Sequence, residues 1–171
     1  MEFCPGTLDD HVACLALIAR SPEHFGTNPP LAQIKSDLES GDLYTAREGA
    51  RILAFSAAGE PRRHIAEILW MVVEPQMRRR GIGTGMLRYM QAHLTTKGCA
   101  LLVVKTLAPT SPYEPYIGTR RFYERHGFLL VDVIDPYPGW SPGNPCAIYV
   151  KPLDPGRENG DAGVGCRGRH G

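Results

Sequence analysis

The sequence predicts one mixed α/β domain in which helices and strands alternate along the chain. The chain has 171 residues, 43% of them hydrophobic, which is enough for a single compact core. Segments with helical periodicity alternate with apolar segments of strand length. Two of the strand segments, 64–75 and 99–107, are apolar almost throughout, as is typical of central strands that are covered on both faces.

The N-terminal part is predicted to form two helices. Asp9 or Asp10 is expected to cap a first helix that runs to about residue 20. Apolar residues recur there at helical spacing: Leu8, Val12, Leu15 and Ile18. The segment SPEHFGTNPP, 21–30, breaks this pattern, and a short second helix at 31–40 ends at Gly41.

A hairpin and a central strand are predicted next. The segments 43–48 and 51–58 read as two strands joined around Gly49. The long apolar strand at 64–75 stops at Pro75.

The second half continues the alternation. A helix is predicted from Gly81 to Lys97, with Ile82, Met86, Met90 and Leu94 on one face and Gly98 just after its end. The remaining elements are a strand at 99–107, a loop at 108–115, a helix at 116–127, and strands at 128–134 and 146–153 separated by the turn-rich segment 135–145.

The last segment, 154–171, differs in composition from the rest. It holds six glycines and no aromatic residue, so it has little to bury. We therefore expect a single domain over 1–153 and a disordered glycine-rich tail over 154–171.

Composition argues against several classes of protein. Lys and Arg number 19 and Asp and Glu 18, so the basic excess expected of a nucleic-acid binder is missing. No apolar run approaches the ~20 residues that span a bilayer, so no membrane partner is expected. The first residues have neither a basic nor an apolar signal region. The five cysteines show no C-x-x-C spacing, so we expect reduced thiols, no metal and a cytoplasmic location.

The stretch RRRGIGTGM, 78–86, lies between a predicted strand and a predicted helix. Unpaired N–H groups and the positive end of the helix would meet there, which favours an anion site. A P-loop is excluded because no Lys follows the glycines. A dinucleotide fingerprint is disfavoured because the third glycine is misplaced and the next strand carries Lys105 instead of an acid. On this motif alone, a solvated arginine run before a glycine-rich helix start stays equally open.

The flanking residues resemble the acetyl-CoA-binding core of the GNAT N-acetyltransferase superfamily. The family's loop pattern [QR]-x-x-G-x-[GA] is met at 78–83, after a strand that ends in VVEP. A second family signature, an aromatic-Tyr pair followed by a Gly-aromatic step, is met by Phe122-Tyr123 and Gly127-Phe128. The resemblance is specific from Ile65 to Phe128 and looser from Leu8 to Leu153, and it does not include the tail.

The resemblance implies a mixed, mostly antiparallel sheet of six or seven strands with helices on both faces. The strands at 64–75 and 99–107 would splay apart and admit acetyl-CoA, whose pantetheine amides would pair with one strand while its pyrophosphate sits on the loop. The residues implied in coenzyme binding are Met71, Val72, Val73, Arg78, Arg79, Arg80, Gly81, Ile82, Gly83, Thr84 and Gly85. Many family members add an Asn seven residues before the catalytic Tyr; this position is Tyr116 here, so that contact is altered.

Acetyl transfer to an amine needs a base and is helped by an acid. Glu67 is the candidate base, since it is the only acid in the apolar run IAEILWMVV and an apolar site tends to raise the pKa of a carboxyl group. It also stands where many family members carry a catalytic Glu. Tyr123 is the candidate acid for the leaving thiolate, and a backbone N–H near Met71 is the candidate oxyanion donor.

The acceptor is expected to be a small or amino-acid-like primary amine. The loops at 21–30, 108–115 and 135–145 would bound its side of the site, with an aromatic and acidic set of side chains: Phe25, Tyr113, Glu114, Tyr137 and Trp140. A protein N-terminus or lysine as acceptor, a longer acyl group, a homodimer, and a non-catalytic acyl-CoA-binding regulator on the same fold all stay open.

Overall fold

The computed structural model describes residues 1–25 and 30–154. In chain order the elements are β1 (Glu2–Pro5), η1 (Leu8–Asp10), α1 (His11–Ala19), α2 (Pro22–Phe25), α3 (Leu31–Ser40), β2 (Asp42–Glu48), β3 (Arg51–Arg62), β4 (Ile65–Val73), η2 (Pro75–Met77), α4 (Ile82–Thr96), β5 (Leu101–Leu107), α5 (Pro115–Arg125), β6 (Leu129–Ile134) and β7 (Cys146–Pro152). The expected tail lies outside these residues, except for Asp154.

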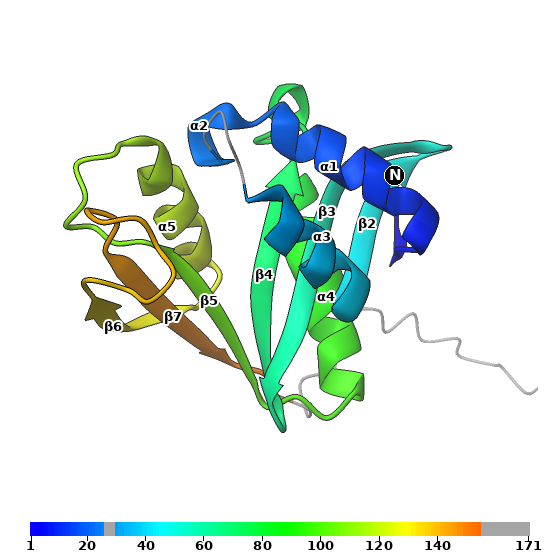
Figure 1. Cartoon of the computed structure of the whole chain (residues 1–171). Helices are drawn as coiled ribbons and strands as arrows, with labels where there is room; N and C mark the ends of the chain where they lie inside the picture. Colours follow the sequence, from blue (N-terminus) through cyan, green and yellow to red (C-terminus); the bar gives the residue numbers. More distant parts are fainter. Residues whose placement is uncertain (26–29, 155–171) are drawn as a thin grey trace, which may run out of the picture.

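Seven strands form one sheet in the order β1-β2-β3-β4-β5-β7-β6 (Figure 1). Neighbouring strands are antiparallel except for the central pair of β4 and β5, so the predicted sheet is confirmed. The strand β1 was not predicted, because its four residues are too few to show alternation and include a proline. It lies at the edge of the sheet, where a residue without an N–H is tolerated.

Helices cover both faces of the sheet, as predicted. One core contains the apolar face of α4, including Met86, Leu87 and Met90, together with Tyr123 of α5. The other core contains the buried side chains of α1 and α3 and Val72 of β4. Each fully buried aliphatic side chain of this kind contributes about 1.5–3 kcal/mol, so both layers add substantially to the free energy of unfolding.

The buried face of α1 matches the predicted one only in part. Ile18 is buried and Leu15 packs against the core, but Leu8 and Val12 are 73% and 78% exposed. Leu8 lies in a 3-10 turn before the α-helix, and the buried face of the helix is centred on Cys14, Leu17 and Ile18, so that Val12 lies to one side of it.

The central strands separate, as the family resemblance implied. Parallel pairing extends from Ile65 with Leu101 to Ile68 with Val104 and then stops, although β4 continues to Val73 and β5 to Leu107. Figure 1 shows the two halves of the sheet as the arms of a V that is closed at the end where β5 begins. One edge of β4 is therefore left without a strand partner over its last residues.

A β-bulge in β4 decides which side chains face which layer. Ala57 pairs with Trp70 and Ala58 with Ile68, so Leu69 is the additional residue. Ile68, before the bulge, belongs to the α4 core, and Val72, after it, belongs to the core of α1 and α3. The bulge thus exchanges the two faces of the strand just before the predicted coenzyme-binding segment, which starts at Met71.

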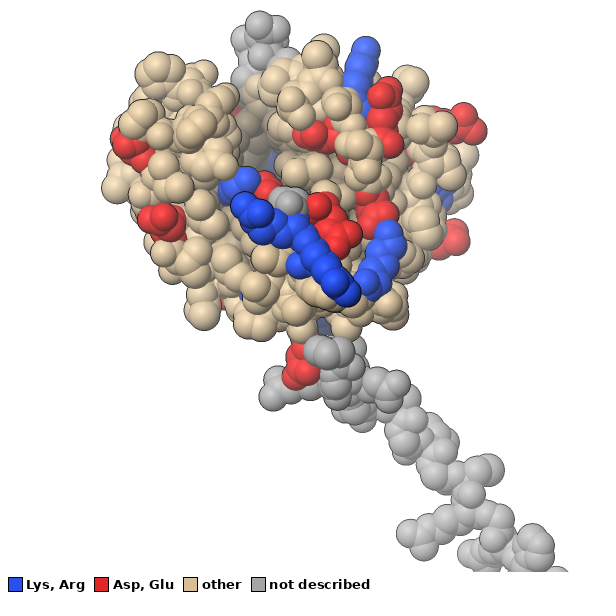
Figure 2. All heavy atoms as spheres, turned by 60° about the horizontal axis from the view of Figure 1, so that its bottom comes forward, with Lys and Arg blue, Asp and Glu red and all other residues tan. Residues whose placement is uncertain are grey.

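The end of the molecule that carries the β3–β4 turn has charges of both signs. Figure 2 shows a band of Lys and Arg side chains there, directly beside Asp and Glu side chains, with uncharged surface around them.

None of the helices in the described part of the chain is long and apolar enough to cross a membrane.

Candidate active site

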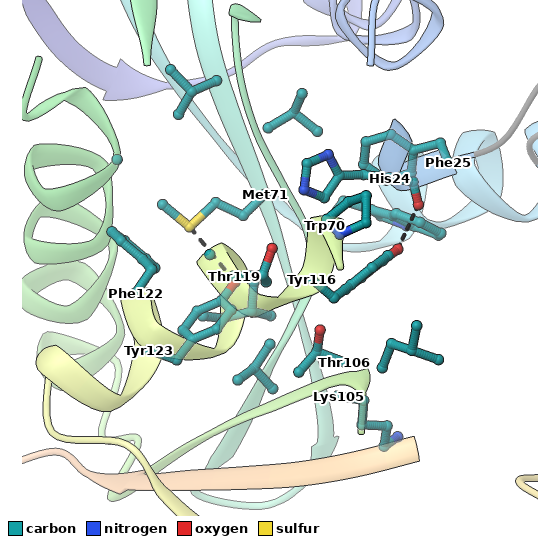
Figure 3. Close-up of a pocket in the computed structure, with 18 of the residues that line it drawn as sticks. His24, Phe25, Trp70, Met71, Lys105, Thr106, Tyr116, Thr119, Phe122 and Tyr123 are labelled. Carbon is teal, nitrogen blue, oxygen red and sulfur yellow. Dashed lines mark hydrogen bonds between the residues drawn. The ribbon is translucent and has the colours of Figure 1, made fainter. Parts of the chain in front are cut away.

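One cleft of about 1490 Å³ occupies the opening between β4 and β5. At one end it is lined by the start of α4 and the second half of α5. At the other end it is lined by aromatic side chains of α2, β4 and the start of α5 (Figure 3), and by those of the loops before α5 and between β6 and β7. Glu67 and Tyr123 both line it, so the structure brings the two candidate catalytic residues into one cavity.

The start of α4 presents unused N–H groups. Gly81 is the residue before the helix and has a φ of 83°, a left-handed conformation that favours glycine. The first N–H to bond within this turn is that of Gly85, to the carbonyl of Gly81 at 2.9 Å. The N–H groups of Ile82, Gly83 and Thr84 therefore have no partner inside the helix, and they lie at its positive end.

Gly83 keeps the cleft open beside these N–H groups. A Cβ at this position would lie 3.4 Å from the ring of Phe122 and 3.7 Å from the side chain of Val73, and all three residues line the cleft. A larger side chain would fill this space, so glycine allows a ligand to approach the backbone.

Three of the residues predicted to bind coenzyme do not line the cleft. Gly85 packs on β1 instead, because a Cβ there would lie 2.3 Å from the ring of Phe3. The side chain of Ile82 is buried in the core, so only its N–H is available to a ligand. Arg80 is exposed outside the cleft lining.

Arg78 and Arg79 line the cleft in different ways. Arg78 donates hydrogen bonds to the carbonyl of Val73 at 3.2 Å, to Ser21 Oγ at 2.8 Å and to the carboxylate of Glu23. Its guanidinium therefore ties the end of β4 to the start of α2. Arg79 is exposed, with a φ of 61° that is rare outside glycine.

The free edge of β4 presents backbone groups to the cleft. The N–H of Glu74 donates to the carbonyl of Leu53 on β3 at 2.8 Å. Because bonding direction alternates along an antiparallel strand, Val72 is turned towards β3, and Met71 and Val73 are turned away from it, towards the gap. Of the three strand residues predicted to pair with pantetheine, two therefore have their backbone groups in a suitable direction.

Tyr123 is buried at the middle of the cleft. Its side chain is 5% exposed, and its hydroxyl lies 3.9 Å from Met71 Sδ (Figure 3). Burial raises the pKa of the phenol, so the hydroxyl stays protonated at neutral pH. A thioether is a weak acceptor, so this proton is available to a stronger one in the cleft.

His126 joins the end of α5 to the start of α4. Its Nδ1 lies 2.7 Å from the carbonyl of Phe122, and its Nε2 lies 3.1 Å from Thr84 Oγ1. A carbonyl can only accept, so Nδ1 carries the proton, and a neutral ring then accepts the Thr84 hydroxyl proton at Nε2. This bridge fixes the distance between two elements that line the same end of the cleft.

Glu67 is held in an ion pair. Both of its carboxylate oxygens lie 2.9 Å from Lys105 Nζ, and its side chain is 13% exposed. Burial alone would lower the pKa of Lys105, but the hydrogen bond to Glu67 and the neighbouring Tyr137 side chain raise it above its usual value. The candidate base is therefore paired with an ammonium group, rather than lying in the purely apolar surroundings that the sequence suggested.

Aromatic side chains enclose the other end of the cleft. Trp70 Nε1 donates to Asp37 at 2.7 Å, and its ring lies 6.0 Å from that of Phe25. The Tyr116 hydroxyl donates to the carbonyl of His24, so this side chain points to α2, and burial raises its pKa. Four of the five predicted acceptor-side residues line the cleft, namely Phe25, Tyr113, Tyr137 and Trp140.

The fifth, Glu114, does not line the cleft. It is exposed and occupies the position that precedes α5.

Comparison with known proteins decides the family. A family model described as an acetyltransferase (GNAT) domain matches residues 39–129, which is more than half of the chain. The chain belongs to the GNAT acetyltransferase family. A search of curated protein sequences finds no match.

Solved structures share the GNAT fold with this chain. The ribosomal-protein-S18-alanine N-acetyltransferase of Escherichia coli is 18% identical, with a TM-score of 0.72 over 92% of this chain and 97% of that chain. An aminoglycoside 6′-N-acetyltransferase in complex with coenzyme A is 19% identical, with a TM-score of 0.71 over 91% and 98%. A GNAT family acetyltransferase of Elizabethkingia anophelis with acetyl-CoA bound is 21% identical, with a TM-score of 0.67 over 89% and 97%.

Several residues of this GNAT cleft were not predicted from the sequence to belong to the site. Lys105, His24 and Asp37 all line it. Lys105 had a detectable signal, because it is the only charged residue in the apolar strand β5. His24 and Asp37 had none, because short helices on the surface carry such residues routinely. Among the described residues no group of three or more His, Cys, Asp or Glu side chains is placed to hold a metal.

Proposed function

We propose that this GNAT protein transfers the acetyl group of acetyl-CoA to the primary amine of a small molecule. The observation that carries the proposal is the opening of β4 from β5. It places a free strand edge, the unused N–H groups of α4, Tyr123 and Glu67 around one cleft. In this proposal the pantetheine amides pair with Met71 and Val73, and the pyrophosphate binds the N–H groups of Ile82, Gly83 and Thr84.

The proposed reaction is direct attack of the amine on the thioester. Glu67 takes one proton from the acceptor ammonium and passes it to solvent. The free nitrogen then forms a bond to the carbonyl carbon, a backbone N–H near Met71 stabilises the oxyanion, and the C–S bond breaks. The sulfur takes a proton from Tyr123, whose phenolate is reprotonated by the second proton that the nitrogen loses.

The acceptor end favours a small molecule over a protein. The Tyr113 hydroxyl donates to the carbonyl of Glu23 at 2.8 Å, and Tyr116 donates to the neighbouring carbonyl of His24. These contacts tie α5 and the preceding loop to α2 beside the cleft, which suits an acceptor small enough to enter between them. The aminoglycoside acetyltransferase and the E. coli ribosomal-protein acetyltransferase share the fold, so fold alone does not separate the two acceptor classes.

Calorimetry and a coupled assay test the proposal. We expect acetyl-CoA to bind and NADH not to bind, and we expect release of free thiol with at least one member of a panel of small amines. Binding without release of thiol from any amine or peptide would favour the acyl-CoA-binding regulator instead. The lack of acetyl-CoA binding would overturn both. The proposed compartment is the cytoplasm, in keeping with the reduced thiols expected from the sequence.

A further inference from the structure

Glu67 and Lys105 form an ion pair at the point where the central strands separate. Glu67 is in the part of β4 that still pairs with β5, and Lys105 is the first residue of β5 beyond the last parallel pair. The ammonium lies 2.9 Å from both carboxylate oxygens, with the two side chains 13% and 29% exposed. The pair therefore lies at the inner end of the acceptor side, with the carboxylate mostly buried and the ammonium partly exposed.

The loop between β6 and β7 covers this pair with aromatic rings. Lys105 Nζ lies 5.6 Å from the centre of the Tyr137 ring, and this ring packs edge-on against Trp140 at 5.4 Å. The ammonium thus has two favourable neighbours, a carboxylate and an aromatic face. Loss of the carboxylate would leave a partly buried cation with only Tyr137 beside it.

This arrangement conflicts with a simple monoamine as acceptor. For Glu67 to take a proton, the acceptor ammonium must reach the oxygens that Lys105 occupies. A monoamine would displace Lys105 and leave it partly buried without an anion, which is unfavourable. An acceptor with a carboxylate next to its amine brings an anion for Lys105 and a cation for Glu67, so one ion pair is replaced by two.

The other charged side chains at the acceptor end are not free to bind the carboxylate of an acceptor. Arg78 is bonded to Glu23 and Ser21, and Asp37 accepts hydrogen bonds from Trp70 and Gln33. Among the described residues that line the cleft, the Lys and Arg side chains besides Lys105 and Arg78 are Arg79 and Arg125. Arg79 precedes α4 and Arg125 ends α5, so both belong to the end that we assign to coenzyme.

We propose that the acceptor is a zwitterion of the α-amino acid class, whose carboxylate binds Lys105 and whose ammonium binds Glu67. Exchange of partners then does two things at once: it recognises the carboxylate and frees Glu67 to take a proton. This inference rests on the proposed acetyltransferase function and names the acceptor class for that site. Lys105 is a specificity-determining residue in this scheme and takes no part in bond making.

Matched acceptor pairs test the inference. The panel consists of the common α-amino acids and the amides of the same amino acids, which keep the amine but lack the carboxylate. We expect turnover of the best amino acid to exceed that of its amide by at least about tenfold, after correction for the lower amine pKa of the amide. Lys105→Met should bring this ratio close to one and leave acetyl-CoA affinity unchanged, whereas Lys105→Arg should retain the preference.

Lys151→Met is the control, because Lys151 also has a half-buried ammonium near an aromatic ring, that of Phe128, but lies outside the cleft lining. Thermal shift with each amino acid, with and without coenzyme A, reads binding independently of turnover. Stabilisation of the wild type and Lys105→Arg, but not of Lys105→Met or the charge-free double variant Glu67→Gln/Lys105→Met, supports the inference.

Equal use of acids and amides, a preference that survives Lys105→Met, or no stabilisation by any amino acid overturns the inference. Each of these results leaves the acetyltransferase function standing if acetyl-CoA still binds and an amine is still acetylated. A failure to bind acetyl-CoA overturns the acetyltransferase function instead, while the thermal shifts still report on the amino acid site.

Discussion

At the scale of single residues, the two candidate catalytic groups lie in contrasting surroundings. Tyr123 is buried next to a thioether, so its proton has no strong acceptor in the folded protein. Glu67 already has a cation on both oxygens. Tyr123 keeps its proton, which fits the proposed acid role, and Glu67 is held in one orientation, which fits the proposed base role. Single substitutions of the two residues should therefore have different effects on turnover.

Replacement of Tyr123 by Phe should lower turnover and leave coenzyme affinity intact. The thiolate loses its proton donor, and general acid help is worth about 10²–10⁴-fold. Steady-state turnover and calorimetry with acetyl-CoA measure the two quantities. Tyr149→Phe is the control, because it removes the hydroxyl that bonds Glu124 at 2.9 Å outside the cleft. Equal losses in both variants would show that Tyr123 acts through packing.

The Glu67→Gln variant should lose most activity at low pH. There the acceptor is an ammonium that needs a base, whereas above the pKa of the amine free acceptor is present and the defect should shrink. The loss at low pH should be about 10²–10⁴-fold. Profiles of turnover against pH for both proteins measure this. A defect that is constant with pH would mean that Glu67 holds Lys105 or the acceptor and takes no proton.

At the scale of elements, two junctions position the cleft. The start of α4 offers its N–H groups beside Gly83, and Arg78 ties the end of β4 to α2. The first junction is expected to bind the coenzyme and the second to hold the acceptor side in place. Substitution at the first junction should therefore change the affinity for acetyl-CoA, and substitution at the second should change the stability of the fold.

Gly83→Val should weaken acetyl-CoA binding far more than Arg80→Ala. The branched side chain would extend towards Phe122 and Val73 and occupy the approach to the helix N–H groups, whereas Arg80 lies outside the cleft lining. Calorimetry measures the affinities. Ala92→Val places the same residue on the exposed side of α4 and controls for helix propensity. Unchanged binding in Gly83→Val would remove the pyrophosphate from this position.

Arg78→Ala should destabilise the protein by about 1–3 kcal/mol, because three hydrogen bonds are lost at a half-exposed site. Burial tends to raise the pKa of Glu23, but bonding to Arg78 lowers it overall below its ordinary value of 4.5. A lowered pKa contributes stability above pH 4.5 that is lost as the pH falls through the folded-state pKa. Urea unfolding at several pH values should therefore show the difference between the two proteins shrinking in acid to the part that the hydrogen bonds to Val73 and Ser21 contribute. A difference that does not change with pH would exclude the ion pair as a contributor.

At the scale of the whole molecule, the domain is proposed to be complete at its last strand. Leu153 is buried and its N–H donates to the carbonyl of Ala100 at 2.8 Å, so the folded part reaches at least this residue. The segment after it is rich in glycine and lacks aromatic residues. A tail of this composition has little apolar surface with which to stabilise the domain.

A chain cut after Asp154 should keep its melting temperature and its affinity for acetyl-CoA. Removal of 155–171 deletes no large apolar side chain other than Val164, so little burial is available to lose. Calorimetric melting and titration of both lengths measure this. A drop of several degrees would show that the segment packs on the domain.

The sequence by itself determined four of the five α-helices that the structure describes, six of the seven strands, the GNAT family and the loop before α4. These follow from local periodicity and from motifs of adjacent residues, which a linear reading can detect. The sequence did not predict α2, because four residues are too few to show helical periodicity and the segment 21–30 was interpreted as a loop. The tertiary structure alone decided the rest. It supplied the edge strand β1, the bulge that exchanges the faces of β4, the role of Arg78 as a tie, and the pairing of Glu67 with Lys105. Each of these depends on residues that are distant in sequence and meet only in the fold: Arg78 lies 55 residues from Glu23, and Lys105 lies 38 from Glu67.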